Sequence, residues 1–367
     1  MSVADRLPTL SGRGGGLSYR VTLGLLFAGS VLAVAVAGAA FPESIWASLL
    51  DILLSRSTLS SALRLATPIV FAALGGIFAE KSGVINIGLE GLLIISAFTS
   101  VFAANLLAGD GSMTRTYLWL GFAAGVLSSA ALAGLFGVVC IRYEADQIIA
   151  GLAVWLIALG LAPFASKVIY GGPSTADTNR TLGTITVPVL SEIPVFGALF
   201  DAAPTVYLML LAVPLSWVVL NRTAFGMHIR AGGENPEALD TVGVSVSRVR
   251  YAGVLLSGVL SGVGGAALSL NLGQFVGNGQ TMVNGKGFIA IVAYLFGNYN
   301  PVGAFLASML FAGLDAVQLR LQYVQGYNVP DTLIQTIPYV TVIVVLALVG
   351  RTQIPDAAGD HYDSGEE

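Results

Sequence analysis

The sequence predicts an all-α polytopic membrane protein, and composition, hydropathy and the spacing of apolar runs support this interpretation. Of the 367 residues, 55% are hydrophobic and 10% are charged, whereas soluble domains carry about 25% charged residues. Mean hydropathy is +0.81, and apolar runs near the roughly 20 residues that a bilayer span requires recur along the chain. A soluble globule is therefore excluded. A nucleic-acid-binding protein is excluded too, because the sequence carries no basic patch.

About ten transmembrane helices are predicted, one for each apolar stretch. The stretches are residues 21–41, 61–79, 84–107, 117–141, 148–166, 204–220, 250–273, 287–297, 302–320 and 332–349. Residues 287–297 are too few to cross alone and indicate a tilted or broken helix, so eight or nine spans remain an alternative. The first stretch is favoured as a retained helix over a signal peptide, because its apolar run exceeds the 7–15 residues of a signal core.

The loops divide the chain into a lead, a membrane domain and a tail. Residues 1–20 hold three consecutive glycines and predict a flexible cytoplasmic lead. Residues 21–349 form the membrane domain, and residues 350–367 an acidic cytoplasmic tail, expected to be a disordered solvated end. Lys and Arg are more frequent in loops on the side of the N-terminus, which places both termini in the cytoplasm. Residues 167–203 then lie outside, and residues 221–249 form a long basic cytoplasmic loop.

The segment GGIFAEKSGVINIGLEG, residues 75–91, places polar residues between two apolar runs. Asn86 and Glu90 are four residues apart, and we expect them on one face of a helix. Buried polar groups in a membrane either line a path or bond to neighbouring helices. Spacing alone favours helix–helix hydrogen bonding over a translocation path.

Two further patterns concern the second half of the membrane domain. Glu234–Asp240 predicts a short helix, with Asn235 as N-cap and Pro236 at the first helical position. Gly258 and Gly262 form a small-residue face that predicts close helix packing.

The sequence gives no sign of chemistry within the chain. Two histidines and one cysteine argue against a metal site. Residues around Lys286 resemble a phosphate-binding loop only partly, because Gln280 occupies the first glycine position and Gly287 replaces the Ser or Thr. We therefore expect no ATP site and no enzyme activity in this chain. The spans also lack a relay of acidic and histidine residues, which argues against proton coupling.

Three segments together carry a family resemblance. The segments resemble the permease family of bacterial ABC importers for ribose, branched-chain amino acids and nucleosides. They are FAEKSGVINIGLEGLL at residues 78–93, residues 226–266 and residues 285–322. The resemblance covers roughly residues 58–349. The phrases GKGFIA, FGNYNP and DAVQLRLQ favour the nucleoside branch over the sugar branch.

The resemblance implies an ABC importer permease fold and a set of partners. A paralogous permease subunit would complete a heterodimer, an ATPase with two nucleotide-binding domains would bind ATP and Mg on the cytoplasmic side, and an extracytoplasmic binding protein would deliver the solute. The machine would sit in the bacterial cytoplasmic membrane, surrounded by lipid, and work by alternating access. The ATPase-coupling residues implied are Gly233, Glu234, Asn235, Pro236, Glu237 and Ala238.

A nucleoside path should offer amides to the sugar hydroxyls and an aromatic face to the base. Asn271 and Gln274 fit the first role, and Phe275 and Tyr294 the second. Asn86 and Glu90 match the family's NIGxEG motif, which does not say whether they touch solute. Two alternatives remain: the same machine carrying ribose or another small sugar, and an ion-coupled secondary transporter or channel.

Overall fold

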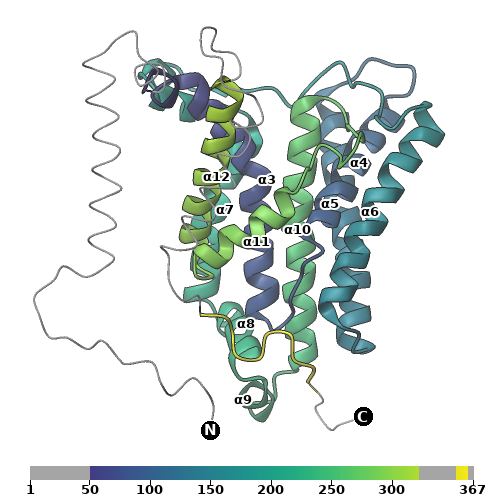
Figure 1. Cartoon of the computed structure of the whole chain (residues 1–367), viewed down its shortest axis with the longest axis vertical. Coiled ribbons are helices and arrows are strands. Elements are labelled where there is room, and N and C mark those ends of the chain that lie inside the picture. The colour runs from purple at the N-terminus through teal and green to yellow at the C-terminus, as the bar shows by residue number, and fades with distance from the viewer. Residues whose placement is uncertain (1–49, 322–352, 363–367) are drawn as a thin grey trace, which may run out of the picture.

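The computed structural model describes residues 50–321 and 353–362, which form a bundle of helices (Figure 1). Seven of the described helical segments are long and apolar enough to cross a membrane. They are α3 (Arg56–Lys81), α4 (Leu89–Ala108), α5 (Arg115–Gly137) with its π-helical extension Val138–Arg142, α6 (Gln147–Tyr170), α7 (Pro204–Arg222), α10 (Val246–Leu272) and α12 (Pro301–Leu321). The chain is thus a multi-pass membrane protein.

The described bundle also contains three shorter α-helices, α8 (Ala224–Glu234), α9 (Pro236–Thr241) and α11 (Lys286–Phe296), and two 3-10 helices, η3 (Leu190–Glu192) and η4 (Phe196–Phe200). Helix α11 lies in the middle of the bundle, and α8 and α9 lie together at one end (Figure 1). We call this the α9 end. The opposite end carries the short strands β1 (Ile185–Thr186) and β2 (Asp201–Ala202), and we call it the hairpin end.

Eight of the ten predicted stretches fall within the described residues, and each is helical. Residues 287–297 correspond to α11, whose 11 residues are too few to span. The stretches 21–41 and 332–349 and the lead 1–20 lie outside the described residues, so the count of ten stays a prediction. The predicted boundary at residue 84 was wrong, because α4 begins at Leu89.

Helix ends follow local capping chemistry. Side chains of Ser55, Thr114, Asp146 and Ser245 accept backbone N–H bonds at the starts of α3, α5, α6 and α10, as N-cap residues do. Gly273 ends α10 at φ +89°, a conformation that suits glycine.

Helix α10 is the centre of the described bundle, packed against α3, α4 and α5. A Cβ at Gly258 would lie 2.9 Å from Ala130 Cα of α5, and one at Gly262 would lie 2.8 Å from Val126 Cα. The predicted small-residue face is therefore confirmed. Such close backbone approach gives helices in lipid their van der Waals contact.

Serine hydroxyls reinforce this contact across helices. Ser96 on α4 donates to Gly262 O at 2.6 Å, and Ser129 on α5 donates to Gly258 O at 2.8 Å. Both serines are fully buried. In an apolar bundle these bonds satisfy the hydroxyls and fix the register of α10 against its neighbours.

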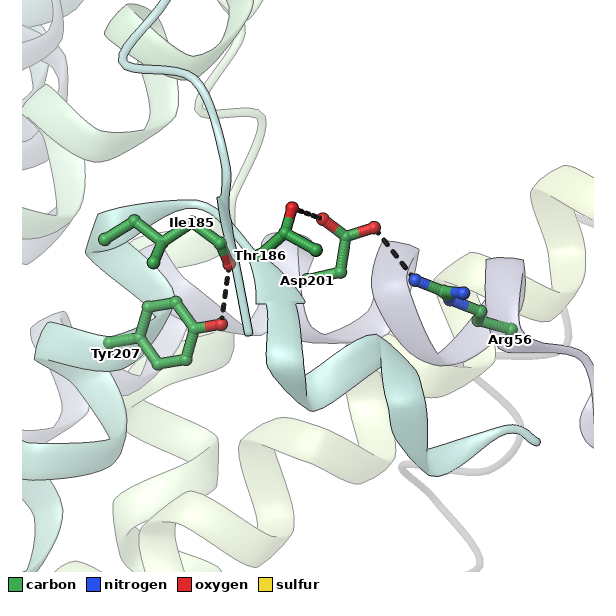
Figure 2. Close-up of polar contacts among 5 residues, drawn as sticks. All are labelled: Arg56, Ile185, Thr186, Asp201 and Tyr207. Carbon is green, nitrogen blue, oxygen red and sulfur yellow. Dashed lines mark hydrogen bonds and ion pairs between the residues drawn. The ribbon is translucent and has the colours of Figure 1, made fainter. Parts of the chain in front are cut away.

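The segment after α6 folds back over the hairpin end. Thr175 N donates to Phe275 O at 3.0 Å, so this segment covers the chain that follows α10. Figure 2 shows how β2 is held: Asp201 accepts a 2.8 Å bond from Thr186 and pairs with Arg56 of α3 at 2.8 Å. Tyr207 of α7 donates to Ile185 O at 3.0 Å. The hairpin thus joins α3 to α7.

Residues 353–362 do not form the free solvated end that the sequence predicted. They lie across the α9 end (Figure 1), with Pro355 and Ala357 buried. The acidic composition suggested solvation, but the backbone of this segment supplies the contacts that hold it, and composition does not report those. We call residues 353–362 the C-terminal strap.

We expect Gly265→Val to destabilise the protein, because its Cβ would overlap Leu93 O and lie 2.9 Å from Ser96 Cβ. Overpacking of this kind costs about 1–3 kcal/mol. Thermal unfolding in detergent should show a lowered midpoint. Gly160→Val on α6 is the control, because apart from the backbone of its own helix no atom of the described residues lies within 4 Å of the added Cβ. Equal midpoints for the two variants would contradict this account of α10 packing.

Candidate functional site

The turn from α8 to α9 is built as the sequence predicted. Asn235 Oδ1 accepts a 2.9 Å bond from Ala238 N, and Pro236 is the first residue of α9. Leu239 is buried beneath the turn. The exposed residues are Glu234, Asn235, Glu237 and Ala238. The turn and the start of α9 therefore expose acidic side chains, while Leu239 anchors α9 to the bundle.

Gly233 brings this turn directly onto α3. A Cβ at Gly233 would lie 2.5 Å from Lys81 O and 3.2 Å from Glu80 O. Only glycine fits there, so the end of α8 packs directly on the last turn of α3 with no intervening side chain. We call residues 233–238 the α8–α9 turn.

Glu80, in that last turn, holds two tyrosines. Its carboxylate accepts hydrogen bonds from Tyr294 of α11 and from Tyr299, the latter at 2.6 Å. Burial, and then the negative charge of Glu80, raise the pKa of Tyr299 above its usual range, so the phenol stays protonated and donates. In the sequence Glu80 is one of the polar residues between two apolar runs, and no role was predicted for it.

Glu90 holds the other end of α11. Its two carboxylate oxygens accept from Gly285 N at 2.7 Å and from Gly287 N at 2.6 Å. These N–H groups belong to the start of α11, where no intrahelical acceptor exists, and the helix dipole favours an anion there. Glu90 is 2% exposed.

The expectation that Asn86 and Glu90 share a helix face was wrong. Gly83 at φ +98° follows α3, and Asn86 lies in the non-helical segment before α4. Asn86 Oδ1 accepts from Gly88 N at 3.1 Å, and its Nδ2 donates to Ser257 Oγ of α10 at 3.1 Å. A side chain that closes its own turn competes with helix formation.

The other predicted path residues lie in different surroundings. Tyr294 and Phe275 are each 0% exposed, and Phe275 packs edge-on against Phe98 at 5.6 Å between ring centroids. Gln274 is partly buried. Asn271 Nδ2 donates to Thr205 Oγ1 of α7 at 2.9 Å.

Asn271 also lines two cavities toward the hairpin end, of about 240 and 260 Å³. Both cavities also include Arg64 of α3, for which no role was predicted from the sequence. A charge inside an apolar helix is the signal that points to it.

The C-terminal strap is bonded to several elements of the bundle. Toward α8, α9, α10 and the α3–α4 connection, the bonds run from Ala357 N to Gly233 O at 2.8 Å, from Gly359 N to Gly83 O at 3.1 Å, from Arg250 Nη1 to Asp360 O at 2.7 Å, and from Tyr362 OH to Asp240 Oδ2 at 3.0 Å. Two further bonds run from Gln147 Nε2 to Gly359 O at 3.4 Å and from Gln353 N to Asn298 Oδ1 at 2.9 Å. The strap therefore holds the α8–α9 turn and the α3–α4 connection together. Partial burial and the bond to Asp240 raise the pKa of Tyr362.

Comparison with known proteins places the chain in a family. The family model described as the permease component of the branched-chain amino acid transport system matches residues 58–350. The chain belongs to this permease family. It is thus a permease and not an ATPase. No solved structure matches it.

The alignments with known relatives extend over most of this chain and over nearly the whole length of each relative. The nucleoside ABC transporter permease NupC of Lactococcus lactis is 39% identical over 81% of this chain and 93% of its own. The guanosine ABC transporter permease NupQ of Bacillus subtilis is 35% identical over 82% and 94%. A putative glucose ABC transporter permease of Haloferax volcanii, TsgC13, is 32% identical over 83% and 97%.

We expect Tyr362→Phe to loosen the strap, because it removes the donor to Asp240 and keeps the ring. A hydrogen bond of this kind contributes about 0.5–1.5 kcal/mol, so amide hydrogen exchange in residues 353–362 should accelerate roughly two- to tenfold. Tyr207→Phe, which removes a similar bond at the hairpin end, should leave that segment unchanged. Unaltered exchange in Tyr362→Phe would show that this bond does not hold the strap.

Proposed function

We propose that the chain is the transmembrane permease subunit of an ATP-driven importer that moves nucleosides inward by alternating access. The observation that carries this proposal is the identity of 39% and 35% to nucleoside and guanosine permeases, over more than nine-tenths of each relative. The match therefore extends along nearly the whole of both relatives rather than being confined to a single motif.

The complete machine would require three partners. A paralogous permease subunit would face this chain, an ATPase with two nucleotide-binding domains would hold ATP and Mg, and an extracytoplasmic binding protein would deliver solute. In this arrangement both termini and the α9 end lie on the cytoplasmic side of a bacterial membrane. The permease then contributes binding and movement, and no covalent chemistry.

The contacts at the α9 end support a coupling role for the α8–α9 turn, residues 233–238, which we therefore also call the coupling turn. Movement of the ATPase against the exposed face of α9 would press Gly233 onto α3, next to Glu80. Glu80 in turn holds α11 through Tyr294. The coupling turn and the central short helix are thus joined by direct contacts, which is the physical requirement for a push at one to bias the position of the other.

A second candidate is the same machine carrying a hexose. The putative glucose permease TsgC13, at 32% identity, favours it. Both candidates share the coupling scheme and differ only in the solute.

The deciding experiment is uptake of radiolabelled guanosine, uridine, adenosine, ribose and glucose in cells with and without the gene. Nucleoside uptake that requires the gene, fails when ATP is depleted and survives a protonophore would support the proposal. Uptake of sugar alone would transfer the chain to the second candidate. Uptake that survives ATP depletion and collapses with the ion gradient would overturn the ATP-driven mechanism.

We expect Glu237→Arg to uncouple the transporter, because it reverses the charge of an exposed residue in the first turn of α9. Membrane insertion should be normal, while solute-stimulated ATP turnover and uptake fall at least about tenfold, which corresponds to 1.4 kcal/mol of lost interaction. Glu192→Arg, an exposed acid toward the hairpin end, is the matched control. Normal uptake in Glu237→Arg would refute the assignment of the coupling turn.

A further inference from the structure

Two adjoining cavities meet at Arg64 of α3 and Asn271 of α10. Their volumes are about 240 and 260 Å³, and together they reach the range of small-molecule sites, about 300–1,000 Å³. Neither cavity has a role in the coupling contacts described above.

Arg64 is a charge placed within an apolar span. It lies eight residues after the start of α3, roughly 12 Å along the helix axis. It makes no hydrogen bond or ion pair with the residues that the structure describes, whereas Arg56, two turns earlier, is paired with Asp201 (Figure 2). Charged side chains inside spans are costly and usually face a cavity or a ligand.

The two cavities differ in chemistry. The first, which we call the apolar lobe, is lined mainly by apolar side chains, among them Leu65, Leu268 and Met282. The second, the polar lobe, includes the hydroxyls of Ser60, Thr181 and Thr184. A flat apolar base on one side and a hydroxyl-rich sugar on the other is the make-up of a nucleoside.

We propose that the two lobes form one binding site for the translocated nucleoside, with the base in the apolar lobe, the ribose in the polar lobe and Arg64 donating to a carbonyl oxygen of the base. This inference rests on the proposed function and names the substrate class: oxo-nucleosides such as guanosine and inosine. A guanidinium donates two parallel bonds to the adjacent O6 and N7 acceptors of a 6-oxopurine, whereas adenine presents an amino donor in place of O6.

Two neighbours of Arg64 fit the same ligand. Asn271 Nδ2 is engaged with Thr205, which leaves Oδ1 as an acceptor for a ribose hydroxyl. Lys286 lines the apolar lobe, and its Nζ donates to Val283 O at 3.2 Å and to Met282 O at 3.5 Å. Because an ammonium has three donors, Lys286 keeps donor capacity for a second acceptor on the base.

The test is the maximal uptake rate of Arg64→Met for guanosine, inosine and adenosine. Rates are measured at saturating solute, so that the selectivity of a delivering protein does not enter. Arg64 is exposed, so methionine fits without repacking. A bidentate contact is worth about 1–3 kcal/mol, so guanosine and inosine uptake should fall about fivefold or more. Adenosine uptake should change less than about threefold, which is 0.65 kcal/mol or less.

Lys167→Met is the matched control. It removes one cation toward the same end of the bundle from α6, which does not line either lobe, and the ratio of guanosine to adenosine uptake should stay as in the wild type. An equal loss for all three nucleosides in Arg64→Met, or no loss, overturns the inference and leaves the proposed function standing. Absence of nucleoside uptake by the wild-type protein instead removes the proposed function itself.

A second measurement reads occupancy without transport. The chain has a single cysteine, Cys140, which is buried, so Ser60→Cys adds one accessible thiol in the polar lobe. Millimolar guanosine should slow maleimide labelling of that thiol, and adding Arg64→Met should abolish the protection. Labelling that guanosine does not slow would show that the lobe does not hold the nucleoside.

Discussion

Two buried carboxylates hold a helix that is too short to cross the membrane. Helix α11 has 11 residues, so both of its ends lie within the bundle, where unsatisfied backbone groups are costly. Glu90 binds the N–H groups at its start, and Glu80 binds Tyr294 near its end and Tyr299 just beyond it. Helices α3 and α4 supply the two acids, and the connection between them sets the position of α11.

The rest of the described structure is arranged around this clamp. Helix α10 packs its small residues against α3, α4 and α5, which keeps α3 and α4 at a fixed separation. The α8–α9 turn packs on the last turn of α3 through Gly233, and the strap binds both Gly233 and Gly83. The two lobes share Arg64, nearer the other end of α3. Helix α3 therefore links the α8–α9 turn, the two-carboxylate clamp and the cavities.

Hydropathy and local capping predicted much of this fold. Apolar length located eight of the described helices, and Asn235 with Pro236 located α9, because these signals depend on neighbours in sequence. The partners of Glu90 could not be predicted, since Gly285 and Gly287 lie almost 200 residues away. The family motif contains both Asn86 and Glu90. Only the tertiary contacts show that Asn86 closes its own turn, whereas Glu90 binds the start of α11. The prediction of a solvated tail was wrong for residues 353–362 for a related reason: composition describes side chains, whereas the strap makes most of its contacts through the backbone.

That use of the backbone has an evolutionary consequence for the strap. Five of the six hydrogen bonds from the strap to the rest of the described chain use main-chain atoms of the strap, from Gln353, Ala357, Gly359 and Asp360, so most side chains there can change without loss of the attachment. The amino-acid sequence of the strap can therefore change while the strap stays in the same position. Homologous transporters could diverge in strap sequence, and so present different surfaces beside α9, while the permease body that carries the segment stays the same.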